Sequence, residues 1–132
     1  MKKFLLILPL LFLTLGCGDD TLINADSPTA PSGPKPVKVE FRVFGSQIQN
    51  TTVTIRHTNS LDGMTNVAGI VPYIFSFDST DDSLFLYVEA GTNSFSQFAT
   101  LQVQIFVDGK LFKEGASQGF VLYSQASGTY RR

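Results

Sequence analysis

The sequence predicts an all-β fold, a small immunoglobulin-like β-sandwich of about seven strands. Apolar and polar residues alternate along several short segments, and clusters of turn-forming residues separate these segments. No window carries the apolar stripe of period 3.6 that marks an amphipathic helix. The strand number is typical of an immunoglobulin domain, but the disulfide and tryptophan of that fold are absent, so packing alone would hold the sheets together. A small barrel is the alternative architecture.

Residues 1–16 have the pattern of a bacterial signal peptide. Lys2 and Lys3 precede a run of apolar residues, 4–15. A membrane-spanning helix needs about 20 apolar residues, so this run is too short for a permanent span and has the length of an h-region. The following residues, LTLGC at 13–17, resemble the lipobox of bacterial lipoproteins. That resemblance implies export, cleavage before Cys17, and attachment of lipid to this cysteine.

Cys17 is the only cysteine in the chain, which excludes an intrachain disulfide. A lone cysteine in an exported protein calls for an explanation, and lipidation supplies one. Two or more acyl chains would hold the protein stably on a membrane. Gly18-Asp19 differs from the inner-membrane retention signal of lipoproteins, which favours an outer membrane, with the domain facing the periplasm or the cell surface. The chain from residue 17 has eight basic and eleven acidic side chains, a balance that argues against nucleic acid as a partner.

Residues 17–36 are predicted to be a disordered tether, and 37–132 a single domain. Four of the six prolines lie in the tether, among Ser, Thr, Gly and Asp. Such a composition buries too little apolar surface to fold, and proline stiffens it into a spacer. At about 3.1 Å per residue, the tether would reach at most roughly 60 Å.

Eight segments of the domain have the composition of strands. Every second residue is apolar in 37–43, 52–56 and 101–107, which gives each segment one buried and one solvated face. The remaining candidate strands are less regular: 71–77, 83–90, 110–113, 119–124 and 127–131. Turn residues separate the segments: 45–46, 59–60, 62–63, 78–82 and 91–94. Asp108-Gly109 predicts a tight hairpin, because glycine tolerates the positive φ that such a turn needs.

Four segments of the domain carry a resemblance to a known family: 39–45 (VEFRVFG), 53–59 (VTIRHTN), 71–73 (VPY) and 105–109 (IFVDG). They are similar to strands, a Pro-aromatic step and a hairpin of the MmpS family, accessory proteins of RND-type lipid exporters in mycobacteria. The resemblance covers 39–123 and implies a β-sandwich next to the membrane with an accessory role. The cysteine pair usual in that family is absent here, and a lipobox stands in place of its membrane helix.

The sequence contains no recognisable catalytic set. His57 is the only histidine, and strand alternation places it on the inward face, so we expect a structural role. The acidic segment 78–82 is either a solvated turn or a calcium loop, although it does not match an EF-hand. Glu89 and Glu114 have no paired carboxylate in view. We therefore expect a protein that is not an enzyme and that needs no metal or cofactor.

A surplus of aromatic residues is the main indication of a binding surface. Both faces are apolar in the segment that contains Phe85 and Tyr87, and the segment that contains Tyr123 has the same character. Phe106 interrupts an otherwise polar face. Because a sandwich strand normally has one solvated face, we expect some of these rings to be exposed. Exposed apolar patches often mark interaction sites, although loops such as 93–99 could cover these rings. The sequence thus predicts a lipid-anchored, non-enzymatic accessory or interaction module of the bacterial cell envelope, with an envelope complex such as an RND-type exporter as its partner. The alternative is a module that binds glycan, peptidoglycan or lipid.

Overall fold

The computed structural model describes residues 33–132, which form an all-β domain and confirm the predicted fold class. The predicted signal peptide, Cys17 and most of the predicted tether lie outside the described residues. The described part contains eight strands: β1 (Val37–Ser46), β2 (Val53–Thr58), β3 (Met64–Gly69), β4 (Tyr73–Ser79), β5 (Ser83–Asn93), β6 (Thr100–Val107), β7 (Lys110–Gln118) and β8 (Val121–Arg131).

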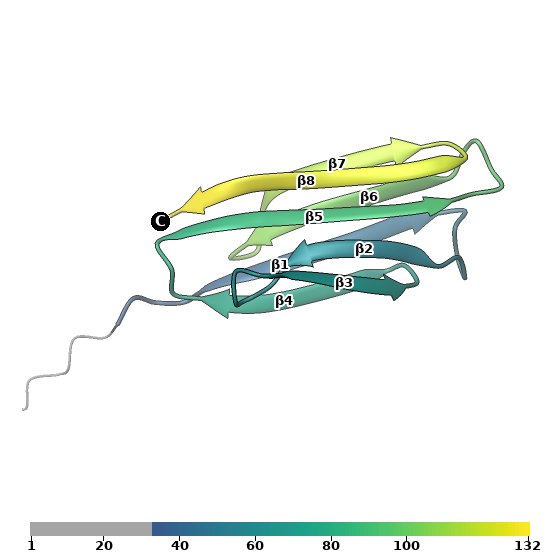
Figure 1. The fold of residues 1–132 in the computed structure, drawn as a ribbon. Helices are drawn as coiled ribbons and strands as arrows, with labels where there is room; N and C mark the ends of the chain where they lie inside the picture. The colour runs from purple at the N-terminus through teal and green to yellow at the C-terminus, as the bar shows by residue number, and fades with distance from the viewer. Residues whose placement is uncertain (1–32) are drawn as a thin grey trace, which may run out of the picture. The chain divides into compact units, whose positions relative to one another are not determined.

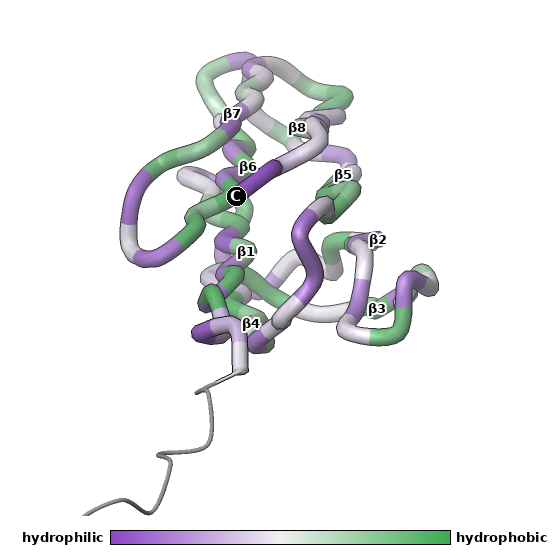
Figure 2. The backbone as a smooth tube through the Cα atoms, turned by 90° about the vertical axis from the view of Figure 1, so that its left-hand side faces the viewer, coloured by the Kyte–Doolittle hydropathy of each residue, from purple (hydrophilic) through white to green (hydrophobic). Residues whose placement is uncertain are grey.

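The strands form two antiparallel four-stranded sheets that pack face to face. One sheet has the order β4-β1-β6-β7 and the other the order β3-β2-β5-β8. Figure 1 shows the second sheet in front of the first, and Figure 2 shows the two layers from the end of the domain where the C-terminus lies. Apart from the β2–β3 and β6–β7 hairpins, every connection crosses between the sheets. This alternation is typical of eight-stranded jelly-roll sandwiches.

The core lies between the sheets and consists of the inward-facing residues that alternation predicted. Strands β1, β2, β5 and β6 contribute most of it, with a buried residue at nearly every second position. The largest fully buried side chains are Phe41, Ile48, Ile55, Leu86, Leu101, Ile105, Leu122 and His57. Half-buried Tyr73, Phe75 and Phe77 of β4 pack against this core. The alternate residues of β1, β2, β5 and β6 point away from the core, so their side chains form the outer faces of the two sheets.

The β6–β7 hairpin turns at Asp108-Gly109 as predicted. Both residues have positive φ, 48° and 76°, as a two-residue type I′ turn requires. Beyond the turn, the register between β6 and β7 shifts at Ile105/Phe106, where Phe112 is the extra residue of a β-bulge. The bulge lets Phe112 pack against the core and meet Tyr130 edge-on, with ring centroids 5.9 Å apart.

The two sheets converge along one side, where β7 approaches β8. Ser117 Oγ and Ser124 Oγ are 2.9 Å apart across this seam. At Gly115 the backbones come so close that an added Cβ would lie 2.9 Å from the carbonyl carbon of Gln125 and closer still to its oxygen. Only glycine fits at this position, so the seam closes the sandwich through backbone contact.

Candidate interaction surfaces

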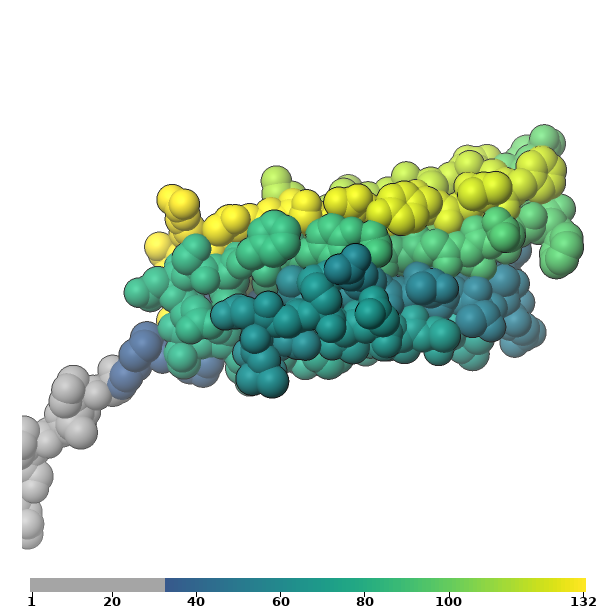
Figure 3. Space-filling view, viewed as in Figure 1, coloured from purple at the N-terminus to yellow at the C-terminus, as the bar shows by residue number. Residues whose placement is uncertain are grey.

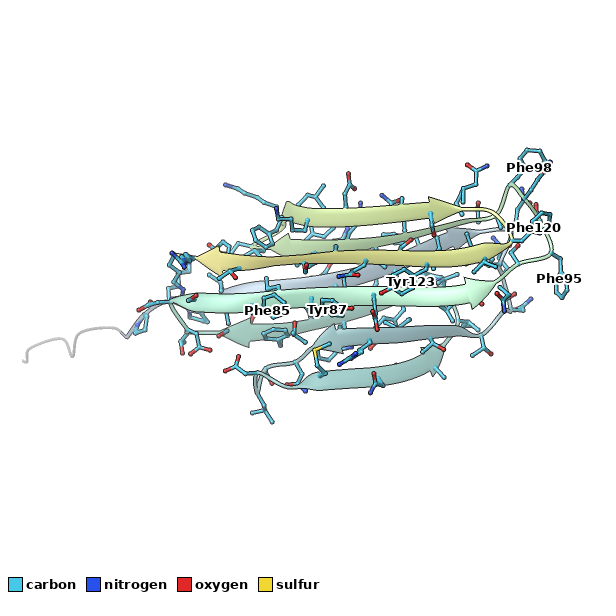
Figure 4. The ribbon with its side chains drawn as sticks, turned by 45° about the horizontal axis from the view of Figure 1, so that its top comes forward. Phe85, Tyr87, Phe95, Phe98, Phe120 and Tyr123 are labelled. Carbon is cyan, nitrogen blue, oxygen red and sulfur yellow. The ribbon has the colours of Figure 1, made fainter. Side chains whose placement is uncertain are left out.

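Three of the four predicted binding residues lie together on the outer face of the β3-β2-β5-β8 sheet. Phe85 and Tyr87 project from β5, and Tyr123 projects from β8, where it pairs with Gly91. Figure 3 views this face, with β5 in green and β8 in yellow, and Figure 4 labels the three side chains. Phe85 and Tyr123 are exposed and Tyr87 is half-buried. We call these three residues the aromatic face.

Glu89 joins the two tyrosines of the aromatic face. The Tyr123 hydroxyl donates a hydrogen bond of 2.6 Å to Glu89 Oε2, and the Tyr87 hydroxyl donates to the same oxygen. Arg56 on β2 lies beside the other carboxylate oxygen, with Nη1 4.0 Å from Oε1. The two tyrosine hydroxyls and Arg56 lower the pKa of Glu89, so its carboxylate is ionised at neutral pH. The face therefore combines aromatic rings with a fixed negative charge.

A shallow hollow of about 300 Å³ lies next to these rings, lined by Arg56, Met64, Phe85 and Tyr87. The rings of Phe85 and Tyr87 stack with centroids 6.5 Å apart and planes inclined by 25°. Burial and the hydrogen bond to Glu89 raise the pKa of Tyr87, so its hydroxyl stays protonated. The hollow thus offers apolar surface and the guanidinium group of Arg56, and Glu89 is hydrogen-bonded to its lining residue Tyr87.

Phe106, the fourth predicted residue, lies on the other sheet. It pairs with Glu40 on β1, and the guanidinium carbon of Arg42 lies 4.2 Å from the centroid of its ring. The ring of Phe106 is half-buried, and Arg42, which covers it in a cation–π contact, also forms an ion pair with Glu40. Phe106 therefore does not share a surface with the aromatic face. The sequence could not show this separation, because it depends on which sheet β6 joins.

His57 lies in the core with both ring nitrogens hydrogen-bonded. Nδ1 lies 2.8 Å from the Thr58 carbonyl oxygen and donates to it, so Nε2 accepts from the Tyr73 hydroxyl at 3.0 Å. The ring also stacks on Phe75, with centroids 4.4 Å apart. Burial lowers the pKa of His57, which favours the neutral ring that this bonding pattern requires. These contacts give His57 the structural role that the sequence predicted.

The acidic segment 78–82 forms the end of β4 and the exposed β4–β5 connection. Ser79 Oγ donates to Asp81 Oδ2 at 3.0 Å and accepts from the Asp81 backbone amide at 3.2 Å, which stabilises the turn locally. Among residues 33–132, no three His, Asp or Glu side chains are grouped so that they could hold a metal ion. The arrangement is that of a solvated turn.

A second aromatic group, which the sequence analysis did not single out, lies at one end of the sandwich. Phe95 and Phe98 project from the β5–β6 connection and Phe120 from the β7–β8 connection, and all three are exposed. Figure 4 shows them together beyond the ends of the strands, whereas Phe85 lies toward the opposite end. We call these three residues the phenylalanine tip. A sequence signal for it exists, since SFSQF places two aromatic rings in a turn otherwise made of small polar residues.

Comparison with protein-family models gives no match to this chain, and no curated protein is significantly similar to it. Within the part of the chain that the structure describes, no helix has the length and hydrophobicity to cross a membrane. Cys17 lies outside that part, so the lipid attachment stays a prediction from the lipobox.

Proposed function

We propose that this protein is a lipid-anchored, non-enzymatic β-sandwich that serves as an accessory or interaction module of the bacterial cell envelope. The lipobox ending at Cys17 supports the lipid anchor, and Gly18-Asp19 after it supports an outer-membrane location. The resemblance of residues 39–123 to the MmpS family supports an accessory role, with an RND-type exporter as the candidate partner. Both ring nitrogens of His57 are hydrogen-bonded within the core, which supports a structural role for this residue.

The observation that carries the interaction role is the aromatic face. Its rings occupy outward positions of β5 and β8, where small polar residues such as Ser127 and Thr129 surround them. A solvated sheet face does not need exposed phenylalanine, and contiguous apolar patches on such faces commonly mark contact sites. Aromatic residues are also enriched at the centres of protein interfaces.

Replacing Phe85 tests this role against a matched control. Phe85 is 60% exposed and Ile74, on the outer face of the other sheet, is 59% exposed. Threonine suits a strand at both sites. We expect Phe85→Thr to lose at least about tenfold in co-purification of a membrane complex, since a central interface residue contributes more than about 1.4 kcal/mol. Ile74→Thr should retain the complex. Equal recovery with both variants, or equal loss, would exclude the aromatic face as the contact.

The anchor is tested separately at Cys17. The variant Cys17→Ser should take up no lipid label and accumulate as uncleaved precursor, whereas Ser124→Ala should be processed normally. A Cys17→Ser protein that is cleaved like its parent, with no lipid on the parent, would disprove the anchor while leaving the interaction test intact.

Glycan binding is the second candidate function, and the Glu89 cluster favours it. Sugar hydroxyls need fixed polar partners beside an apolar ring face, and Glu89, Arg56 and Tyr123 provide such groups next to Phe85 and Tyr87. Retention of the protein on purified cell-wall polymer should then fall about tenfold in Glu89→Ala, corresponding to about 1.4 kcal/mol, while Glu114→Ala on the other sheet has no effect. An absence of retention of the parent protein would exclude this function.

A further inference from the structure

The charged residues of the domain are unevenly distributed along its long axis. Four connections form the end that carries the phenylalanine tip, and none of them contains a charged side chain: 47–52, 70–72, 94–99 and 119–120. The connections at the opposite end carry Asp62, Asp81, Asp82 and Asp108, and the chain ends there with Arg131 and Arg132. The connections at one end of the sandwich therefore carry charged side chains, and those at the other end carry none.

Hydrogen bonds hold the tip connections in a defined conformation. The Ser94 amide donates to the Phe120 carbonyl at 2.7 Å, and the Gly119 amide donates to the Ala99 carbonyl at 3.0 Å, so the two connections are joined. Within the β5–β6 connection, the Phe98 amide donates to Ser96 Oγ at 3.1 Å. An apolar environment penalises every unpaired backbone group, and these bonds satisfy several of them internally. The amides of Ser94, Phe98 and Gly119 therefore need no hydrogen-bond partner from the surroundings of the tip.

The exposed apolar area distinguishes between the surfaces that could cover the tip. A phenylalanine side chain presents 150–250 Å², so the exposed parts of the three rings amount to roughly 400 Å². A stable protein interface buries about 800 Å² on each partner, twice this value. Three separate rings suit a fluid apolar medium better than a preformed protein surface. We propose that Phe95, Phe98 and Phe120 insert into the interfacial region of a lipid bilayer.

The lack of charge at the tip specifies the kind of membrane binding. Interfacial binding depends on buried apolar area and on attraction between basic residues and anionic lipids. The tip has only the first of these, so its binding is insensitive to salt and to lipid charge. The proposed Cys17 anchor would allow the tip to reach the same bilayer, and this step alone rests on the proposed function. The tether joins the domain at the start of β1, so it must be longer than a strand for the tip at the other end to reach the bilayer. A ten-residue strand spans about 33 Å, which is shorter than the roughly 60 Å that the predicted tether reaches.

A tryptophan reporter tests the insertion directly, because the chain contains no tryptophan. Phe98→Trp places the reporter on the tip, and Leu111→Trp places a control at a half-exposed site near the opposite end. Each variant, purified in its processed form, is mixed with phosphatidylcholine vesicles or with vesicles containing brominated phosphatidylcholine. We expect the emission of Phe98→Trp to shift to shorter wavelength and to be quenched by the brominated lipid, equally at low and high salt. Leu111→Trp should show neither effect.

Other outcomes would overturn the proposal. A shift in Phe98→Trp that grows with protein concentration without vesicles would assign the tip to self-association. No shift, or a larger effect in Leu111→Trp, would show that the tip stays in water. Adding Phe95→Ser and Phe120→Ser to the Phe98→Trp protein should abolish the shift, and its persistence would exclude a shared insertion. The mass of the purified protein reports lipid on Cys17 independently, so a failed anchor and a failed tip are distinguishable.

Discussion

Gly115 provides the sharpest test of the fold, because its replacement by alanine must separate two backbones. An added Cβ would lie 2.9 Å from the carbonyl carbon of Gln125 and closer to its oxygen, and neither atom can move without shifting β8. Overpacking of this kind costs about 1–3 kcal/mol, and we expect Gly115→Ala to fall at about 2 kcal/mol. For a domain of about 100 residues this loss corresponds to a decrease in Tm of about 8–16 °C.

Gly69→Ala is the matched control for this measurement. Gly69 is also a strand residue, but the nearest atom to an added Cβ is Val67 Cγ1 at 3.9 Å, an ordinary contact. Glycine in a strand is less favourable than alanine by roughly 0.5–1 kcal/mol, so Gly69→Ala should be neutral or slightly stabilising. Urea unfolding followed by circular dichroism measures both variants. If Gly115→Ala proves as stable as Gly69→Ala, the sheets do not converge at this seam.

Three further predictions concern the buried histidine and the Glu89 cluster. Tyr73→Phe removes the donor to His57 Nε2 and should lower the free energy of unfolding by about 1–3 kcal/mol in urea titrations at neutral pH. The pKa of His57 is lower in the folded protein than its ordinary 6.5, so the unfolded chain takes up the proton first. Stability present above pH 6.5 should therefore be lost as the pH falls through the folded pKa, and unfolding titrations in His57→Phe should lack this component. The hydrogen bond to Glu89 raises the pKa of Tyr123, so ultraviolet titration of Glu89→Gln should show Tyr123 ionising at lower pH than in the parent protein.

The strands that the sequence predicted well are those with a strongly apolar inner face. Buried positions alternate along most of β1, β2, β5 and β6, because each of these strands has the core on one side and water on the other. β3 was not predicted, since it is an edge strand with only Val67 packed against the core. β8 was predicted as two strands, 119–124 and 127–131, but is a single one. Its central inward residues are Ser124 and Ala126, which are buried but are not recognisable as a core pattern.

The candidate site depends on strand pairing, which a single sequence does not reveal. Alternation placed Phe85 and Tyr87 on the same face of their strand, and the structure shows that this face points outward. The neighbouring position of Tyr123 follows from the pairing of β5 with β8, in which Tyr123 lies opposite Gly91, a residue distant in the chain. Long-range register of this kind is fixed by packing of the whole sandwich. The same reason explains why Phe106, with a similar local pattern, lies on the other sheet.

The two exposed aromatic groups differ in how far the fold itself accounts for them. Aromatic residues are favoured in strands, where cross-strand neighbours stabilise them, so the rings of the aromatic face have a partial structural explanation. The indication of a binding role for the aromatic face comes from Glu89, because two tyrosine hydroxyls donate hydrogen bonds to its carboxylate and fix its position. The phenylalanine tip has no such explanation. Exposed loop positions tolerate most residues within about 0.5 kcal/mol, so stability does not require three phenylalanines in two connections free of charge. The proposed insertion into a lipid bilayer would account for all three rings, whereas the aromatic face remains the candidate contact for a protein or glycan partner.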